Sequence, residues 1–178
     1  MTEGWDDNPD RLQQKDLDAR WTKKNGISYY GYKNNICIDI DHGFIRRYAV
    51  IPANIHNSQM LRRLLDPENE HDHVWADSAY SGECFEDLLN LGGFESLIHE
   101  KGARNHPISD AGKELNRVKS STTRACLEHV FGGMTMSMGG KLTRKIGLEK
   151  NEAWWGLKNL TFNFLRDLQR SSHIAKVS

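Results

Sequence analysis

The feature that most constrains the fold is an alternating run that begins at residue 28 and then turns back on itself. In "ISYYGYKNNICIDI", aromatic and aliphatic side chains share one face, at Tyr30, Tyr32, Ile36, Ile38 and Ile40. Polar side chains occupy the other face, at Lys33, Asn35 and Asp39. A period of two is typical of a β-strand. The turn-forming "DHG" and a second β-rich run, "FIRRYAVI", follow, so residues 28–51 are predicted to form a hairpin that ends at Pro52.

Short helical and strand patterns follow the hairpin. "HNSQMLRRLLD" predicts a helix capped by Asn57 or Ser58, and "GECFEDLLNLGG" predicts a second helix that ends near Gly92. "HVWAD" and "FESLIHE" are short, bounded runs that predict strands. The order of hairpin, helix, strand, helix and strand indicates a mixed α/β core.

Polar or helical segments flank this core. Residues 1–26 are predicted to be a polar N-terminal arm, and residues 101–120 a basic insertion or loop without a core face. A helix follows, with Leu127, Val130, Phe131 and Met134 on one face, and Gly132 and Gly133 obscure its end. Residues 150–170 are predicted to be an amphipathic C-terminal helix whose core face holds Leu157, Leu160, Phe164, Leu165 and Leu168.

Composition excludes several classes of protein. No run of eighteen apolar residues exists, so no membrane span is expected, and the N-terminus resembles no signal peptide. Three widely spaced cysteines, Cys37, Cys84 and Cys126, favour reduced thiols and a cytoplasmic setting. The net charge is zero, but residues 1–100 carry −8 and residues 101–178 carry +8. The basic part could face a polyanion, or it could be an uneven solvated surface.

Asp77 is the first candidate for chemistry. It closes the predicted buried strand in "HVWADSAY", and ligand sites of α/β sheets gather at the carboxyl ends of strands. An aspartate in this position also often caps the turn or helix that follows. Position alone leaves both roles open.

Glu128 is the second candidate, at the edge of the apolar stripe of its predicted helix, one turn after Arg124. The two could form a surface ion pair, or Arg124 could orient Glu128 as a metal ligand or contact a phosphate. Two carboxylates can hold Mg²⁺, although two-metal phosphodiester chemistry normally needs more acidic ligands.

Basic residues bracket Glu128 in the sequence, which suits a polyanionic substrate. The predicted DNA-binding set is Lys101, Arg104, Arg117, Lys119, Lys141, Arg144 and Lys145. Trp154 and Trp155 are expected to pack in a helix rather than to stack on bases.

Seven segments, in order, resemble the catalytic domain of bacterial insertion-sequence transposases of the DDE class, in the IS-four/IS-five group. They are "DLDARWTKKNGISYYGYKNNICID", "RRYAVIPANIHNSQ", "VWADSAY", "IHEKGARNHPIS", "RACLEHVFG", "MGGKLTRKIG" and "GLKNLTFNFLR". The resemblance runs from about Asp16 to about Arg166.

The resemblance implies an RNase H-like fold, a mixed sheet flanked by helices, over residues 27–178. It implies cleavage and strand transfer at the terminal inverted repeats of double-stranded DNA, with Mg²⁺ (or Mn²⁺) as cofactor. Within it, Asp77 and Glu128 correspond to catalytic metal ligands, and Arg124 to the arginine before the glutamate. The implied protein is cytoplasmic and nucleoid-associated, and its partners include full-length transposase or a second copy.

The chain departs from the family pattern at three places. Ser121 stands where the family has a tyrosine, and Asn57 gives an amide where a related motif has a carboxylate. The first catalytic aspartate belongs on a first strand upstream of "YYGYK". The acidic residues of that region lie in no apolar run: Asp6, Asp7, Asp10, Asp16 and Asp18.

Two functions are therefore expected as alternatives. One is a truncated DDE transposase domain that lacks its first strand and is not active by itself. The other is a non-catalytic fragment that binds DNA or transposase and inhibits transposition.

Overall fold

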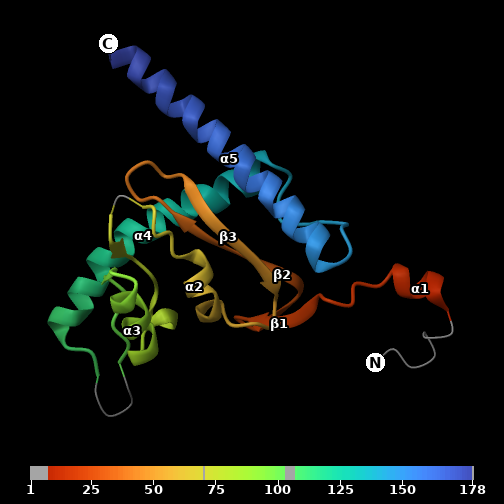
Figure 1. The fold of residues 1–178 in the computed structure, drawn as a ribbon, viewed down its shortest axis with the longest axis horizontal. Coiled ribbons are helices and arrows are strands. Elements are labelled where there is room, and N and C mark those ends of the chain that lie inside the picture. Colours follow the sequence, from red (N-terminus) through yellow and green to blue (C-terminus); the bar gives the residue numbers. More distant parts are fainter. Residues whose placement is uncertain (1–7, 70, 103–106, 178) are drawn as a thin grey trace.

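The computed structural model describes residues 8–69, 71–102 and 107–177, without the side chains of Thr122, Arg124 and residues 173–177 (Figure 1). The elements before Asp77 are α1 (Pro9–Gln13), β1 (Arg20–Lys24), β2 (Ile27–Ile38), β3 (Ile45–Pro52), the 3-10 turn η1 (Asn57–Met60), α2 (Leu61–Leu64) and β4 (His73–Val74). Those after it are η2 (Ser78–Tyr80), α3 (Glu83–Leu91), β5 (Glu95–Ser96), α4 (Asp110–Ser137) and α5 (Leu148–Val177). The predicted mixed α/β class is confirmed.

The predicted hairpin is confirmed as the centre of a three-stranded antiparallel sheet with the order β1-β2-β3. Tyr32 lies opposite Pro52 and Ile38 opposite Ile45, with an irregularity between Cys37 and Ile38. The carboxylate of Asp39 accepts hydrogen bonds from the backbone N–H groups of Asp41 and His42, which stabilises the turn into β3.

A second, smaller sheet consists of β4 and β5, which pair in parallel. The backbone contact continues beyond the strands, since Leu97 and His99 donate to the carbonyl groups of Val74 and Ala76. α2 and α3 pack here, and Leu61, Leu89 and Ile98 form the buried centre of this part. The two strands predicted around Asp77 are therefore present, although they are shorter than expected.

The larger core lies between the three-stranded sheet, the second half of α4 and α5. Its buried members are Ile45, Val50, Val130, Met134, Trp155 and Phe162. The first half of α4 instead contacts the segment that follows β5, since the Asn116 amide exchanges two hydrogen bonds with the backbone of Glu100. α4 therefore links the two parts of the molecule.

The predicted polar arm of residues 1–26 is wrong for its described second half. β1 pairs with β2, and the two-residue turn at Asn25 and Gly26 has positive φ at both positions, 51° and 81°. Asn-Gly is the preferred sequence of such a hairpin turn, because both residues tolerate this conformation. The Asp16 carboxylate also accepts hydrogen bonds from the Tyr32 hydroxyl (2.6 Å) and the Gly147 N–H (3.1 Å), which ties the segment to the body.

The predicted basic loop at residues 101–120 is wrong from Asp110 onward, because α4 begins there with Ser109 as its N-cap. Residues 103–106 lie outside the described residues. Gly132 and Gly133 do not end the helix, which continues to Ser137. The expected cap of the helix after the hairpin is also different: the His56 side chain, rather than Asn57 or Ser58, accepts the capping hydrogen bond, from the Ser58 N–H.

The predicted core face of the C-terminal helix is wrong. Leu157, Leu160, Phe164, Leu165 and Leu168 are exposed. The buried face of α5 holds Asn151, Trp155, Asn159 and Phe162. Neighbouring Asn163 holds the backbone of Ile45, donating to its carbonyl and accepting from its N–H, both at 2.8 Å. Asn163 therefore fits this face because it satisfies both backbone groups of a strand residue.

Trp154 and Trp155 meet edge to face, with ring centroids 4.9 Å apart, and Trp155 is buried, so the expected helix packing is confirmed. Lys158 lies over the Trp154 ring, 4.0 Å from its centroid. Among the described residues, no helix combines the length and apolar character needed to cross a bilayer.

Asp66, which follows α2, links this helix to β3 through two arginines, and substituting it tests the contribution of these contacts to stability. It is buried and receives hydrogen bonds from Arg46 (2.9 Å) and Arg47 (3.1 Å). Burial raises the pKa of this carboxyl, but the hydrogen bonds from both arginines outweigh burial and leave the pKa below its ordinary value. Asp66→Asn is expected to lower the free energy of unfolding by about 1–3 kcal/mol at pH 7.

The effect of Asp66→Asn should depend on pH. A lowered pKa in the folded state contributes stability that is complete above about pH 4, the ordinary carboxyl value, and is lost as pH falls through the folded pKa. Urea denaturation should therefore show a smaller difference from wild type at pH 3 than at pH 7. Asp87→Asn, at an exposed position of α3, is the matched control, and an equal loss at both pH values would contradict the prediction.

Candidate active site between the two sheets

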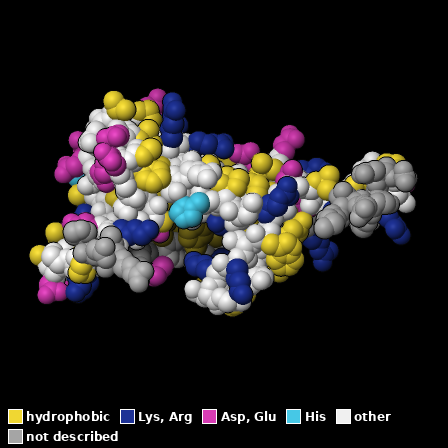
Figure 2. Space-filling view, turned by 90° about the horizontal axis from the view of Figure 1, so that it is seen from below, with side chains coloured by type: hydrophobic (Ala, Val, Ile, Leu, Met, Phe, Trp, Pro, Cys, Tyr) yellow, Lys and Arg dark blue, Asp and Glu magenta, His cyan; other side chains and the backbone are white. Residues whose placement is uncertain are grey.

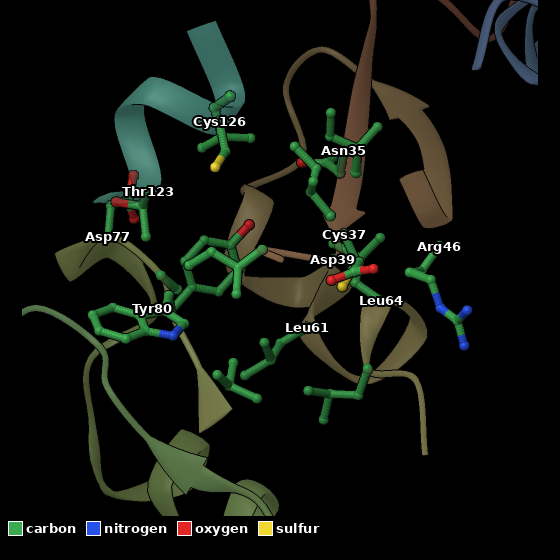
Figure 3. A pocket seen from close by; sticks show the side chains of 18 of the residues that line it. Asn35, Cys37, Asp39, Arg46, Leu61, Leu64, Asp77, Tyr80, Thr123 and Cys126 are labelled. Carbon is green, nitrogen blue, oxygen red and sulfur yellow. The ribbon is translucent and has the colours of Figure 1, made fainter. Parts of the chain in front are cut away.

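A cavity of about 720 Å³ lies between the three-stranded sheet and the smaller sheet. β2 contributes residues 34–38 to its wall, and the end of β4 contributes Val74, Trp75, Ala76 and Asp77. Leu61 and Leu64 come from α2, and Thr123 and Cys126 from α4. Figure 3 shows Asn35, Cys37 and Asp39 on one side of this space and Asp77 on the other.

Asp77 lines the cavity and caps the turn that follows it. Its side chain is the N-cap of η2, where Oδ1 accepts a hydrogen bond of 2.9 Å from the Ala79 N–H. Tyr80 follows, and burial together with the nearby Asp77 charge raises the pKa of the Tyr80 hydroxyl to about 12. The capping role that position allowed is therefore confirmed, and the role as a metal ligand stays a prediction.

Glu128 lies on α4, as predicted, but its side chain is exposed and the cavity wall here consists of Cys126 and Leu127. The backbone of Arg124 belongs to α4 and its side chain is not described. Within the described ranges, no three His, Cys, Asp or Glu side chains gather closely enough to hold a metal ion. Asp77 and Glu128 carry carboxylate oxygens, the ligand type that Mg²⁺ prefers, and their role as metal ligands stays a prediction.

Sequence reasoning missed two further carboxylates in the cavity wall, Asp39 and Asp66. Burial opposes ionisation of Asp39, but the hydrogen bond with His42 Nδ1 (2.8 Å) and two backbone N–H groups bring its pKa below the ordinary value. The alternation of the first predicted strand placed Asp39 on the same face as Asn35, and this pattern could have identified Asp39 as a site residue. No sequence pattern identifies Asp66, because only the fold brings Arg46 and Arg47 to it.

The predicted DNA-binding residues do not form one patch. Arg117 and Lys119 lie in the first half of α4, whereas Lys141, Arg144 and Lys145 follow its end. From Lys119 to the end of α4 at Ser137 the helix runs for about 27 Å, at about 1.5 Å per residue. Lys119 Nζ donates to the Ile98 carbonyl (3.1 Å), and Arg117 forms two hydrogen bonds with Glu114. Figure 2 likewise shows Lys and Arg side chains spread over one face with acidic side chains among them.

Lys101, Lys141, Arg144 and Lys145 are exposed, whereas Arg104 lies outside the described residues. Sequence reasoning also missed the exposed β1–β2 ribbon, which carries Lys23 and Lys24. On the same ribbon the rings of Trp21 and Tyr30 meet with centroids 5.2 Å apart. The Asn-Gly turn between the two strands was the signal that could have identified this ribbon.

Comparison with known proteins agrees with the resemblance. The family described as "Transposase DDE domain" matches residues 6–164. A protein of Neisseria meningitidis serogroup B, "Transposase for insertion sequence element IS1106", is 32% identical over 158 residues, which cover 89% of this chain and 54% of that relative. The chain therefore spans about half the length of this curated relative, and no solved structure gives a significant match. Because the family match runs over most of its length, the chain belongs to the transposase DDE domain family.

Proposed function

We propose that the chain forms part of the catalytic domain of an insertion-sequence transposase. In this role it takes part in phosphodiester cleavage and strand transfer at the terminal inverted repeats of double-stranded DNA. The observation that carries the proposal is the family match over residues 6–164, which includes Asp77 at the wall of the cavity between the sheets.

The order of elements supports an RNase H-like interpretation of residues 27–178. An antiparallel hairpin precedes a helix, a strand, a helix, a parallel strand and the long α4. Asp77 follows β4, at the carboxyl edge where α/β sheets place ligands. In one respect the structure differs from the single mixed sheet that the resemblance implies: β2 and β4 belong to separate sheets.

Within this proposal, Asp77 and Glu128 are metal ligands for Mg²⁺ (or Mn²⁺), and Arg124 positions the glutamate or contacts a phosphate. Such an ion would stabilise charge on the phosphodiester oxygens. Two-metal phosphodiester chemistry normally uses more than two acidic ligands, so we expect a third carboxylate to take part. We do not expect the two carboxylates alone to support cleavage of DNA.

The test uses a supercoiled plasmid that carries the terminal inverted repeats of the IS1106 element. The chain is assayed alone, with the part of the Neisseria relative that it does not match, and as a fusion with that part. Nicking at the repeat ends that requires both parts and Mg²⁺ is the expected result. Absence of nicking under all three conditions would contradict the proposed catalytic role.

The second candidate function is inhibition of transposition by a non-catalytic fragment. The observation that favours it is that no group of three potential metal ligands occurs among the described residues. Adding the chain to active full-length transposase would then reduce nicking in a dose-dependent way, and an unchanged rate would exclude inhibition.

DNA binding is expected from the loop between α4 and α5. Arg144 and Lys145 are exposed there, and each phosphate contact contributes about 0.9 to the slope of log affinity against log salt. Arg144→Ala/Lys145→Ala is therefore expected to lower that slope by about 2 in gel-shift titrations. Arg62→Ala/Arg63→Ala removes the same charge from α2 and should leave the slope unchanged, and an equal change in both variants would argue against a local DNA contact.

A further inference from the structure

The β1–β2 ribbon, residues 20–31, carries exposed side chains that the candidate active site does not use. β1 is an edge strand of the three-stranded sheet (Figure 1). Every residue from Lys23 to Tyr30 is exposed, so the end of the ribbon is open to solvent on both of its faces. A two-stranded ribbon buries little apolar surface of its own, and its exposed side chains are available to a partner.

The charge of the ribbon has one sign. From Arg20 to Lys33 the chain has four basic residues and no acidic residue, whereas residues 1–100 together carry −8. Within the described ranges, neither Lys23 nor Lys24 forms an ion pair. Burial lowers the pKa of the Lys33 amine, and the nearby Lys24 charge lowers it further. Positive charges that lie close together without acidic partners attract a polyanion.

Large aromatic side chains accompany the lysines on both faces of the ribbon. Trp21 is paired with Tyr30, and side chains alternate along a strand, so Trp21, Tyr30 and Lys23 share one face. Lys24 and Tyr29 share the other face for the same reason. Trp21 is 66% exposed although its ring contacts that of Tyr30. Each face therefore presents a lysine together with an exposed aromatic ring, a combination that suits nucleic acid.

Hydrogen bonds hold the base of the ribbon in a fixed orientation. The Tyr30 hydroxyl donates to the Asp16 carbonyl oxygen (2.9 Å), and the Tyr32 hydroxyl donates to the Asp16 carboxylate (2.6 Å). The tight turn at Asn25 and Gly26 fixes the other end. A pre-organised element loses less conformational entropy on binding than a flexible loop does.

The dimensions of the ribbon agree with the major groove of duplex DNA. A β-ribbon with its side chains is about 10 Å thick, since packed sheets lie about 10 Å apart. The major groove is about 12 Å wide and admits a two-stranded ribbon, whereas the minor groove is only about 6 Å wide. The major groove is about 8.5 Å deep, which corresponds to two or three residues of each strand at about 3.4 Å per residue. Lys23 and Lys24 lie within this distance of the turn.

We propose that the β1–β2 ribbon binds duplex DNA by entering the major groove with its Asn25–Gly26 turn first. Lys23 and Lys24, on opposite faces, contact the phosphates of the two strands that border the groove. Trp21, further from the turn, contacts the sugar–phosphate backbone at the rim. Such contacts contribute affinity and orientation rather than sequence specificity. The inference rests on the proposed function for the choice of DNA as the polyanion.

Removal of the two lysine charges is the first test. Lys23→Ala/Lys24→Ala is expected to lower the slope of log affinity against log salt by about 2, from about 0.9 for each lost phosphate contact. The measurement is fluorescence anisotropy of a labelled 24-base-pair duplex between about 50 and 200 mM salt. Lys23→Arg/Lys24→Arg keeps the charge and should retain the slope. An unchanged slope for the alanine variant, or an equal change for Arg62→Ala/Arg63→Ala on α2, would overturn the proposal.

Trp21 gives a test that does not depend on charge. Trp21→Ala should weaken duplex binding by at least about fivefold and leave the salt slope unchanged, because an uncharged contact releases no counterion. Trp21→Phe keeps a ring beside Tyr30 and should retain most of the affinity. Leu157→Ala, which truncates an equally exposed apolar side chain on α5, is the control. Full affinity of Trp21→Ala, or an equal loss for Leu157→Ala, would contradict the placement of the ribbon.

Competition with groove-specific ligands identifies the groove. Methyl green occupies the major groove and netropsin the minor groove of a duplex rich in A·T pairs. Methyl green should abolish the difference in affinity between wild type and Lys23→Ala/Lys24→Ala, whereas netropsin should leave the difference intact. The reverse result would overturn entry into the major groove. A larger contribution of the two lysines to binding of single-stranded DNA than to binding of the duplex would also overturn it.

The results separate the ribbon from the catalytic role. Duplex binding that depends on Lys23 and Lys24, without nicking of plasmid by the fusion protein, would retain the ribbon contact and reject the catalytic role. Nicking at the wild-type rate by a Lys23→Ala/Lys24→Ala fusion, with an unchanged salt slope, would retain the catalytic role and reject the ribbon contact.

Discussion

Trp155→Ala is expected to lower the free energy of unfolding by about 3–5 kcal/mol, the usual cost of truncating a large buried aromatic side chain. Trp155 is 8% exposed and packs with Val130, Met134 and Phe162 in the larger core. Its removal would leave a cavity between α5 and the sheet that amide neighbours could not fill. Urea denaturation followed by circular dichroism measures the loss, and Trp155→Phe provides a milder variant if the alanine protein is too unstable to analyse.

Leu157→Ala is the control that distinguishes the observed face of α5 from the face predicted by its leucines. Leu157 is 66% exposed, so its truncation should change stability by less than about 0.5 kcal/mol. A large loss for Leu157→Ala together with a small loss for Trp155→Ala would mean that α5 packs through its leucine face instead.

Asp77→Asn is expected to lower nicking activity while leaving stability almost unchanged, which separates the catalytic role of Asp77 from its role as a helix cap. The asparagine side-chain oxygen can still accept the hydrogen bond from the Ala79 N–H, so stability should stay within about 0.5 kcal/mol of wild type. The substitution removes the negative charge that a divalent cation needs. In the fusion with the unmatched part of the relative, nicking should fall more than about 100-fold, beyond the 10–100-fold typical of residues that only orient a ligand.

Two further variants make the Asp77 result specific. Asp77→Ala removes both the cap and the charge, so it should lose activity and also some stability, about 1 kcal/mol. Asp87→Asn, on α3, should leave nicking unchanged. Retention of full activity by Asp77→Asn would show that the carboxylate serves only as the cap of η2.

Local sequence patterns predicted the elements whose apolar residues recur with the period of the element itself. The alternation from Tyr30 to Ile40 predicted β2, the apolar run before Asp77 predicted β4, and the helical spacing around Val130 and Met134 predicted that part of α4. Each pattern has the period of its own backbone geometry, 2 for strands and 3.6 for helices. The order of the motifs was likewise sufficient to identify the family.

Patterns failed where partners distant in sequence decide burial. α5 has apolar residues around much of its circumference, so its helical periodicity predicted that the leucine face is buried. The structure instead buries the face with Asn151 and Asn159. Asn159 receives a hydrogen bond from Asn34 (3.1 Å), and the Asn151 amide donates to the Gly147 carbonyl (2.8 Å). These hydrogen bonds offset part of the cost of burying each amide. The Asn34–Asn159 partners are 125 residues apart, so no local window contains both of them.

The sequence by itself determined the family, the hairpin, and Asp77 at the end of a short strand, because each depends on residues adjacent in the chain. Only the tertiary structure decided that the two sheets are separate, that residues of both line a common cavity, and that Glu128 lies outside the wall of that cavity. The physical reason is that strand pairing and cavity volume depend on distances between elements. Those distances follow from the packing of α2 and α4 between the two sheets and of α5 against the three-stranded sheet, which no local periodicity encodes.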